Sequence, residues 1–301
     1  MVINKNIIAI LVLVLLYIFV KKILLYNSNQ TKIMNVNKQN ANNVPKMIAF
    51  DLDETLGYFT ELSIFWDALE NYYNKKLSNE QFFQVLNIFP EVFRPDIFKI
   101  LNMINNKRKK SLCNKICIYT NNQGPKSWVK MISEYFNKKL GYKVFDDIIA
   151  AYKVRGEIIE PKRTSNEKNL KDLLNCTKMP LNTEICFIDD LYHHLMYKKN
   201  VYYIHIKPYR HSLPFIEMAT RYYDKIIKPH ENIKKDLFIN NIVSFMKQYE
   251  YYVVKKNSEK EKEDILNSKE LYSNLDDYTK NNKISNTKKR RKRINKTLKN
   301  N

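Results

Sequence analysis

The sequence predicts an α/β protein whose core is a parallel five-stranded sheet flanked by helices. Short apolar runs of strand length alternate with stretches in which apolar residues recur at helical spacing. Acidic or hydroxyl side chains directly follow three of the runs, as expected at the carboxyl ends of parallel strands, where open α/β sheets bind their ligands. The five predicted strands are 47–50, 115–120, 144–151, 184–188 and 201–206.

Length and charge set the first bounds on function. The 301 residues suffice for one large domain or two small ones, and the apolar and aromatic content predicts a folded protein. The formal net charge of +21 favours anionic partners, with biased genome composition as the alternative reason for so many lysines. The four cysteines lack zinc-ribbon spacing, so we interpret them as reduced thiols.

An apolar run at residues 7–20 predicts a membrane anchor. Fourteen helical residues span about 21 Å, and extension to Tyr26, with Lys21 and Lys22 reaching the headgroups, gives about 30 Å. We interpret residues 1–26 as a single-pass transmembrane helix. A cleaved signal peptide is the alternative, but the basic start is weak and no small-residue cleavage site follows. Lysines after the run outnumber the single one before it, so the remaining chain is expected to face the cytosol.

Composition divides the rest of the chain into four parts. Residues 27–44 are polar and aperiodic, which predicts a flexible linker. Residues 45–228 hold the predicted strands and form the main domain, and 229–256 are expected to be a helical extension. Residues 257–301 are charged and weakly patterned, with a continuous basic block at 288–293. We interpret them as a disordered basic tail that binds nucleic acid or anionic lipid.

The first predicted strand ends in two acids. Asp51 follows the apolar run directly, and Asp53 comes two residues later. Carboxylates so close repel each other unless a cation or a shared proton intervenes. This pattern favours a metal site or acid–base chemistry, and a solvated acidic turn is the alternative.

Two short helices are predicted between this strand and the next. Apolar residues recur at helical spacing over 58–90, and the second helix is expected to begin near Ser78. The segment is long enough for a small helical flap over the acids. Its aromatic residues are interpreted as core rather than as substrate contacts. Arg94-Pro95 then precedes a helix over 96–105, and residues 106–111 are expected to be a basic exposed loop.

The second strand ends in Thr120-Asn121, before a helix predicted from Pro125 to Asn137. A hydroxyl and free backbone N–H groups at such a junction are suited to hold a phosphate. After the third strand, a loop over 153–165 is expected to end at Ser165, which would cap a helix with Lys168 in its first turn.

The fourth strand ends in a second acid pair, Asp189-Asp190. Two acidic strand tips together predict a Mg²⁺ site, because Mg²⁺ prefers hard oxygen ligands. His193 and His194 follow closely, but imidazole does not suit this ion, so we do not assign them as ligands.

The stretch Asp51-Leu52-Asp53-Glu54-Thr55-Leu56 resembles motif I of the haloacid dehalogenase superfamily of phosphohydrolases. The same six residues resemble motif I of one branch of this superfamily, the RNA polymerase II C-terminal-domain and NLI-interacting-factor phosphatases. Thr120 resembles motif II, Asp189-Asp190 resembles motif IV, and Lys168 is the choice for motif III, with Lys162 and Lys171 as alternatives. The resemblance covers about residues 46–224.

The resemblance implies a Rossmann-like fold and a Mg²⁺-dependent phosphatase that works through an aspartyl-phosphate. Asp51 is then the nucleophile and Asp53 the general acid and base, while Thr120, Asn121 and Lys168 bind the phosphate. The implied metal ligands are Asp51, the Asp53 backbone carbonyl, Asp189 and Asp190.

No large insertion separates motifs II and III, so an open site and a bulky substrate are expected, such as a phosphoserine or phosphothreonine in a protein. The residues after Asp190 and the helical flap depart from the named branch. Two alternatives remain: a nucleic-acid-end or nucleotide phosphatase of the same superfamily, and an inactive membrane-tethered binding module.

Overall fold

The computed structural model describes Lys21 and residues 44–228, 233–249 and 257–280. The chain divides after Val44 into two units, and the fold below is that of the second. The predicted anchor and linker therefore lie outside the described residues, apart from Lys21 and Val44, and so does the basic block at 288–293. No helix among the described residues is long and apolar enough to cross a membrane.

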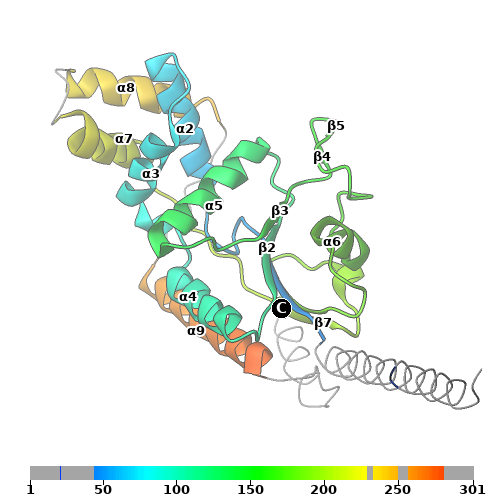
Figure 1. The fold of residues 1–301 in the computed structure, drawn as a ribbon. Helices are drawn as coiled ribbons and strands as arrows, with labels where there is room; N and C mark the ends of the chain where they lie inside the picture. Colours follow the sequence, from blue (N-terminus) through cyan, green and yellow to red (C-terminus); the bar gives the residue numbers. More distant parts are fainter. Residues whose placement is uncertain (1–20, 22–43, 229–232, 250–256, 281–301) are drawn as a thin grey trace, which may run out of the picture. The chain divides into compact units, whose positions relative to one another are not determined.

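Five parallel strands form the main sheet in the order β3-β2-β1-β6-β7 (Figure 1). They are β1 (Lys46–Phe50), β2 (Lys115–Tyr119), β3 (Asp147–Ile149), β6 (Glu184–Asp189) and β7 (Val201–His205). The predicted α/β class and the parallel sheet are confirmed, and the arrangement is consistent with a Rossmann-like fold. Strands β2 and β3 lie on one side of β1. Strands β6 and β7, which come later in the chain, lie on its other side. The order thus reverses at β1, the kind of position where such sheets bind ligands.

Both faces of the sheet are covered by helices. Side chains alternate along a strand, so Met47 and Ala49 pack in a small core with α6 (Leu170–Thr177). Ile48 and Phe50 belong to the larger core that includes residues of α4 (Ile97–Lys109) and α5 (Lys126–Leu140). Burial on both faces explains why the strands are continuous apolar runs.

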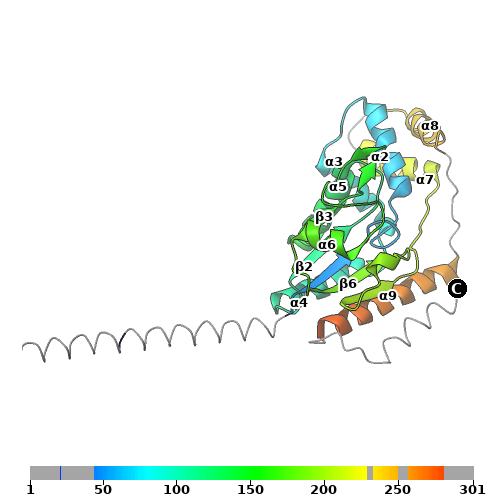
Figure 2. The same cartoon turned by 90° about the vertical axis from the view of Figure 1, so that its right-hand side faces the viewer.

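A group of four helices lies at one end of the unit in both views (Figures 1 and 2). It comprises α2 (Thr60–Tyr73), α3 (Asn79–Ile88), α7 (Phe215–Tyr222) and α8 (Lys235–Met246). Helix α3 begins as predicted, because Ser78 forms a reciprocal capping box with Gln81. Short elements complete the chain: η1 (Pro90–Val92), the hairpin β4 (Lys153–Val154) and β5 (Glu157–Ile158), η2 (His194–Met196) and the π-helical turn η3 (Tyr223–Ile227).

Three local predictions were wrong. Helix α6 is capped by Asn169, whose side chain accepts a hydrogen bond from the Asp172 N–H, whereas the Ser165 hydroxyl donates to the Glu167 carbonyl. The loop over 153–165 contains the β4–β5 hairpin. Helix α4 continues to Lys109, because its basic last turn is favourable at a helix carboxyl end.

The predicted disordered tail was also wrong for its first part. Residues Ser258–Lys280 form helix α9, which packs along α4 and β7 (Figures 1 and 2). The helix buries Leu271, Leu275 and Tyr278. Only this narrow apolar stripe marks the helix in an otherwise charged segment, which is why composition predicted disorder.

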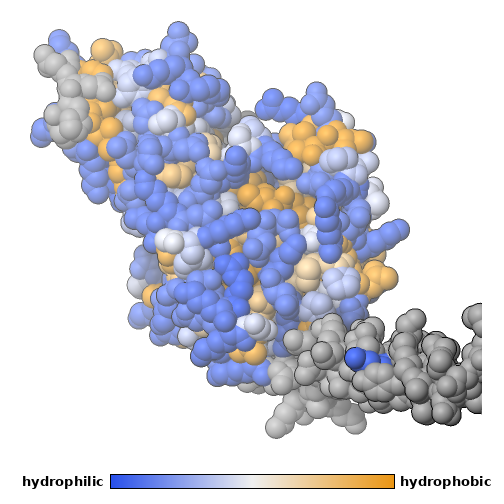
Figure 3. Space-filling view, in the orientation of Figure 1, coloured by the Kyte–Doolittle hydropathy of each residue, from blue (hydrophilic) through white to orange (hydrophobic). Residues whose placement is uncertain are grey.

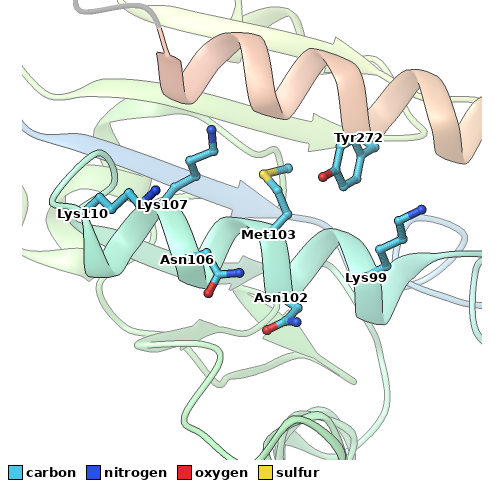
Figure 4. Close-up of a pocket in the computed structure, with 7 residues that line it drawn as sticks. All are labelled: Lys99, Asn102, Met103, Asn106, Lys107, Lys110 and Tyr272. Carbon is cyan, nitrogen blue, oxygen red and sulfur yellow. The ribbon is translucent and has the colours of Figure 1, made fainter.

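Figure 3 shows a mostly hydrophilic face with separate hydrophobic areas. A groove between α4 and α9 is lined by lysines, asparagines, one methionine and one tyrosine (Figure 4), namely Lys99, Asn102, Met103, Asn106, Lys107, Lys110 and Tyr272. None of the acids at the strand tips lies in this groove.

Tyr278 attaches α9 to the start of the sheet. Its buried hydroxyl lies 3.2 Å from the Met47 carbonyl oxygen and 2.8 Å from that of Glu184, so it donates between β1 and β6. The Lys46 ammonium donates to the Tyr278 carbonyl at 3.2 Å. These two strands carry the acid pairs at their other ends, so α9 is part of the domain that positions the site.

We predict that Tyr278→Phe lowers the free energy of unfolding by about 1–3 kcal/mol, because a buried hydrogen bond is lost and its acceptors lose a partner. Denaturant unfolding of the full chain measures this. Tyr272→Phe is the matched control, since that hydroxyl bonds to none of the described residues and should cost little. Equal effects of the two substitutions would contradict the role assigned to Tyr278.

Candidate active site

The two acid pairs meet at the carboxyl edge of the sheet. Strands β1 and β6 pair in register, with Phe50 opposite Ile188. The Asp51 N–H extends this pairing by donating to the Ile188 carbonyl at 2.9 Å. Asp51 and Asp189 are therefore neighbours on adjacent strands, although 138 positions separate them in the sequence.

Three carboxylates form a cluster that is able to hold a metal ion. Ligand oxygens of Asp51, Asp189 and Asp190 all lie within 4.8 Å of one another. Asp51 and Asp189 are buried, and the Thr55 hydroxyl donates to Asp190 Oδ1 at 3.2 Å. The side chain of Asp53 is not in this cluster. An all-oxygen donor set of this kind fits Mg²⁺.

Lys168 lies between the two buried acids. Its Nζ is 2.5 Å from Asp51 Oδ1 and 2.7 Å from Asp189 Oδ2, and the residue is 2% exposed. Of the three lysines considered from the sequence, Lys168 is the one brought to the acids, whereas Lys162 and Lys171 are exposed. Lys168 precedes α6 instead of lying in its first turn.

The pKa values of Asp51 and Asp189 are shifted in opposite directions by their surroundings. Burial raises the pKa of Asp51 to about 8; Lys168 opposes this rise, and Asp189 and Asp53 add to it. Burial also disfavours ionised Asp189, but Lys168 and His193 outweigh it, so the pKa of Asp189 is lowered. For Lys168, burial opposes the charge, yet the two acids raise its pKa. Burial, Asp189 and Glu54 also raise the pKa of Asp190, to about 6. The cluster thus holds one firm carboxylate–ammonium pair, Asp189 with Lys168, and two carboxyls that lack sufficient positive charge.

Asp53 is held by Asn122, a residue that the sequence analysis did not assign. The Asn122 side-chain amide donates to Asp53 Oδ2 at 2.7 Å, while its own oxygen accepts from the Gly124 N–H at 2.8 Å. A Cβ at Gly124 would lie 2.9 Å from that oxygen, so glycine permits the contact. Burial raises the pKa of Asp53, and the Asn122 hydrogen bond opposes the rise. A carboxyl with a raised pKa is suited to give and take a proton.

Thr120 and Asn121 follow β2 at the same edge of the sheet. The Thr120 N–H donates to the Ile149 carbonyl at 3.0 Å. Its hydroxyl oxygen accepts from the Asn122 N–H at 3.1 Å, which leaves the hydroxyl proton free to be donated. The Asn121 side-chain oxygen accepts from Arg163 at 2.8 Å.

Arg94 supports the loop after β1. It is 1% exposed and donates to three backbone carbonyls, those of Thr55 at 2.6 Å, Glu54 at 2.5 Å and Lys207 at 2.9 Å. Glu54 has a left-handed φ of 56°, which a non-glycine residue adopts only when its surroundings hold it there. The sequence analysis noted Arg94 only as part of the Arg94-Pro95 pair before a predicted helix. It missed Arg163 and Asn122, whose partners are set by tertiary contacts.

Comparison of the chain with protein-family models, with curated proteins and with solved structures finds no match.

We predict that Asp51→Asn stabilises the metal-free protein at pH 8. The carboxyl pKa is about 8 folded against 3.8 for the free group, so the folded state holds the proton more tightly. Its contribution to stability is present below the unfolded pKa and is lost as pH rises through the folded one. With EDTA present, the Tm of the parent should fall more steeply from pH 5 to 8 than that of Asp51→Asn. At pH 8 the Tm of Asp51→Asn should exceed that of the parent by at least about 2–4 °C, which is the effect of about 1 kcal/mol in a domain of this size.

The exposed Glu157→Gln is the control and should follow the parent across this range. Parallel Tm profiles for the parent and Asp51→Asn would show that Asp51 keeps its ordinary pKa.

Proposed function

We propose that this chain is a Mg²⁺-dependent phosphomonoester hydrolase of the haloacid dehalogenase superfamily. The observation that carries the proposal is the buried bridge of Lys168 between Asp51 and Asp189. Burying two carboxyl groups and an ammonium together costs stability, so their presence at the edge of the sheet favours a functional role. The four motifs that resemble this superfamily supply the residues of the site. The helical pair α2–α3 lies between Asp53 and Arg94 in the sequence, where apolar periodicity predicted a small helical flap.

In this proposal Asp51 attacks the phosphorus atom of a phosphomonoester. One carboxylate oxygen forms a bond to phosphorus while the bond from phosphorus to the leaving oxygen breaks. Asp53 gives its proton to that leaving oxygen. Asp53, now ionised, takes a proton from water, whose oxygen attacks phosphorus and frees Asp51 and inorganic phosphate. The raised pKa of Asp53 and its Asn122 contact suit a group that alternates between these states.

Three groups are proposed to hold the transferred phosphoryl oxygens. The Lys168 ammonium and the Thr120 hydroxyl donate to them, and the Asn121 amide offers a third donor. Such preorganised donors contribute most where burial excludes water, as at Lys168 and Thr120, which are 2% and 1% exposed.

The carboxylate cluster fits a magnesium ion. Asp51, Asp189 and Asp190 would hold it with side-chain oxygens, and the Asp53 carbonyl is proposed as a further ligand. When bound, Mg²⁺ supplies positive charge that offsets the repulsion between the Asp51 carboxylate and a phosphate anion. The pKa of Asp51 is raised in the metal-free site even with Lys168 beside it, which supports a need for further positive charge there.

We predict Mg²⁺-dependent hydrolysis of a generic aryl phosphate by the purified chain. Asp51→Asn should abolish turnover, because an amide is not a competent nucleophile. Asp53→Asn should lower kcat by at least about 100-fold, since general acid–base catalysis contributes about 10²–10⁴-fold. Steady-state rates with Mg²⁺ and with EDTA measure both effects.

Exposed Glu157→Gln is again the control and should retain the parent rate. Turnover that survives Asp51→Asn would contradict the nucleophile assignment. A folded parent that binds Mg²⁺ and phosphate without turnover would favour the alternative of an inactive binding module.

The preferred substrate is a phosphoserine or phosphothreonine in a protein. Between Thr120 and Lys168 the described chain adds only β3 and the short β4–β5 hairpin to α5, which supports an open site. A nucleic-acid-end or nucleotide phosphatase is the second candidate, favoured by the net charge of +21 and by the nine Lys or Arg residues in 281–301.

Removal of residues 281–301 separates these candidates. A protein phosphatase working through the pocket should keep its kcat/KM for a phosphopeptide. A nucleic-acid phosphatase should instead lose affinity for a 5′-phosphorylated oligonucleotide, and the loss should shrink at high salt because counterion release drives such binding. Rates with both substrates at 50 and 300 mM salt, for the full chain and the truncated one, decide between them.

The N-terminal segment is proposed as a single-pass anchor that leaves the catalytic domain in the cytosol, with anionic lipid as an additional partner of the tail. The apolar run at 7–20 and the lysines that follow support this. Separation of membrane and soluble fractions with and without residues 1–44 checks it.

A further inference from the structure

Arg163 is a buried residue whose side chain joins three segments of the chain. It is 2% exposed. Its Nη1 donates to the carbonyls of Thr120 at 3.0 Å and Ala150 at 2.8 Å, and its Nη2 donates to the Asn166 carbonyl at 3.0 Å and to Asn121 Oδ1 at 2.8 Å. Four hydrogen bonds therefore connect the ends of β2 and β3 with the loop that leads to α6.

The charge of Arg163 is not neutralised by an ion pair. Its four hydrogen-bond acceptors are neutral oxygens, and no carboxylate among the described residues forms a salt bridge with it. Its guanidinium lies 4.8 Å from the centre of the Tyr119 ring, and the Lys168 ammonium lies 5.8 Å from the same ring. A buried cation without a counterion is costly, and a bound phosphate beside it would supply the missing negative charge.

Arg163 also settles the orientation of Asn121. A guanidinium can only donate hydrogen bonds, so the atom of Asn121 that faces it must be the side-chain oxygen. The amide nitrogen is then turned away from Arg163. Among the described residues this nitrogen has no acceptor, so its two N–H groups are available to a ligand at the end of β2.

We infer that Arg163 is a positioning residue of the phosphate pocket. It does not reach the substrate. It fixes Asn121 with its N–H groups toward the phosphoryl oxygens, holds the Lys168 loop against the end of β2, and adds positive potential to the pocket. The inference rests on the proposed function in placing a phosphate beside Thr120 and Asn121.

The first test uses inorganic phosphate as the probe and the full chain as the protein. Calorimetric titration with Mg²⁺ present gives the phosphate Kd, and aryl phosphate hydrolysis gives kcat/KM. We expect Arg163→Ala to weaken phosphate binding by about 10-fold or more and to lower kcat/KM by about 100-fold, the effect of a small misplacement of binding groups. The control is Arg155→Ala, which removes an exposed arginine side chain from the β4–β5 hairpin. It should change neither the phosphate Kd nor kcat/KM.

Added guanidinium ion then tests whether the cation itself matters. At on the order of 0.1 M, well below denaturing concentrations, it should restore a saturable part of phosphate binding and activity to Arg163→Ala. Sodium chloride at equal ionic strength should not. Arg163→Lys should recover little, because one ammonium cannot bridge four oxygens in the planar geometry of a guanidinium.

A double-mutant cycle tests the action through Asn121. Asn121→Ala should weaken phosphate binding in the parent and have a much smaller effect in Arg163→Ala, because the amide is no longer held. Additive losses, or losses that follow only the fall in Tm and do not respond to guanidinium, would make Arg163 merely structural and overturn the inference. Phosphate binding that depends on Arg163 in a chain without turnover would support the inference while rejecting hydrolysis. A parent chain that does not bind phosphate would overturn both.

Discussion

The carboxyl edge of the sheet depends on one buried interaction, the Lys168 ammonium held between Asp51 and Asp189. Parallel pairing of β1 and β6 forces the two acids together, and burial removes the water that would separate their charges. One ammonium satisfies Asp189 but not all the acids, so the pKa of Asp51 remains high. The site is therefore built with an unmet demand for positive charge, which a divalent cation is suited to supply.

The surrounding structure uses buried arginines to keep this edge in shape. Arg94 bonds to carbonyls of the loop after β1, and Arg163 bonds to carbonyls at the ends of β2 and β3. Neutral oxygens accept hydrogen bonds from two nitrogens of each guanidinium without cancelling its charge, while Arg94 Nη1 and Arg163 Nε have no hydrogen-bond partner among the described residues. Both arginines therefore do two things at once: they fix irregular backbone, and they raise the positive potential around a cluster of acids.

Much of the fold could be predicted from the sequence because its signals are local. All five strands and the cap at Ser78 follow from short apolar runs and one capping box. Helix α9 could not be predicted, because its stability comes from a narrow stripe that packs on α4 and β7 and from Tyr278 bonding to two distant strands. The α6 start was misassigned because Ser165 and Asn169 are both good caps, and tertiary contacts chose between them.

The residues of the candidate site also differ in whether the sequence alone could reveal them. Residues at strand tips were found because a strand end is visible in the sequence, and Asp51, Thr120 and Asp189 all stand there. Asn122 and Arg163 act on other side chains or on backbone carbonyls, so their importance depends on which segments the fold brings to them. Lys168 is an intermediate case. A lysine was expected in this segment, but only the contacts of Lys168 with Asp51 and Asp189 distinguish it from Lys162 and Lys171. The groups proposed to contact a substrate could thus be predicted from one sequence, whereas the groups proposed to orient them require the three-dimensional structure.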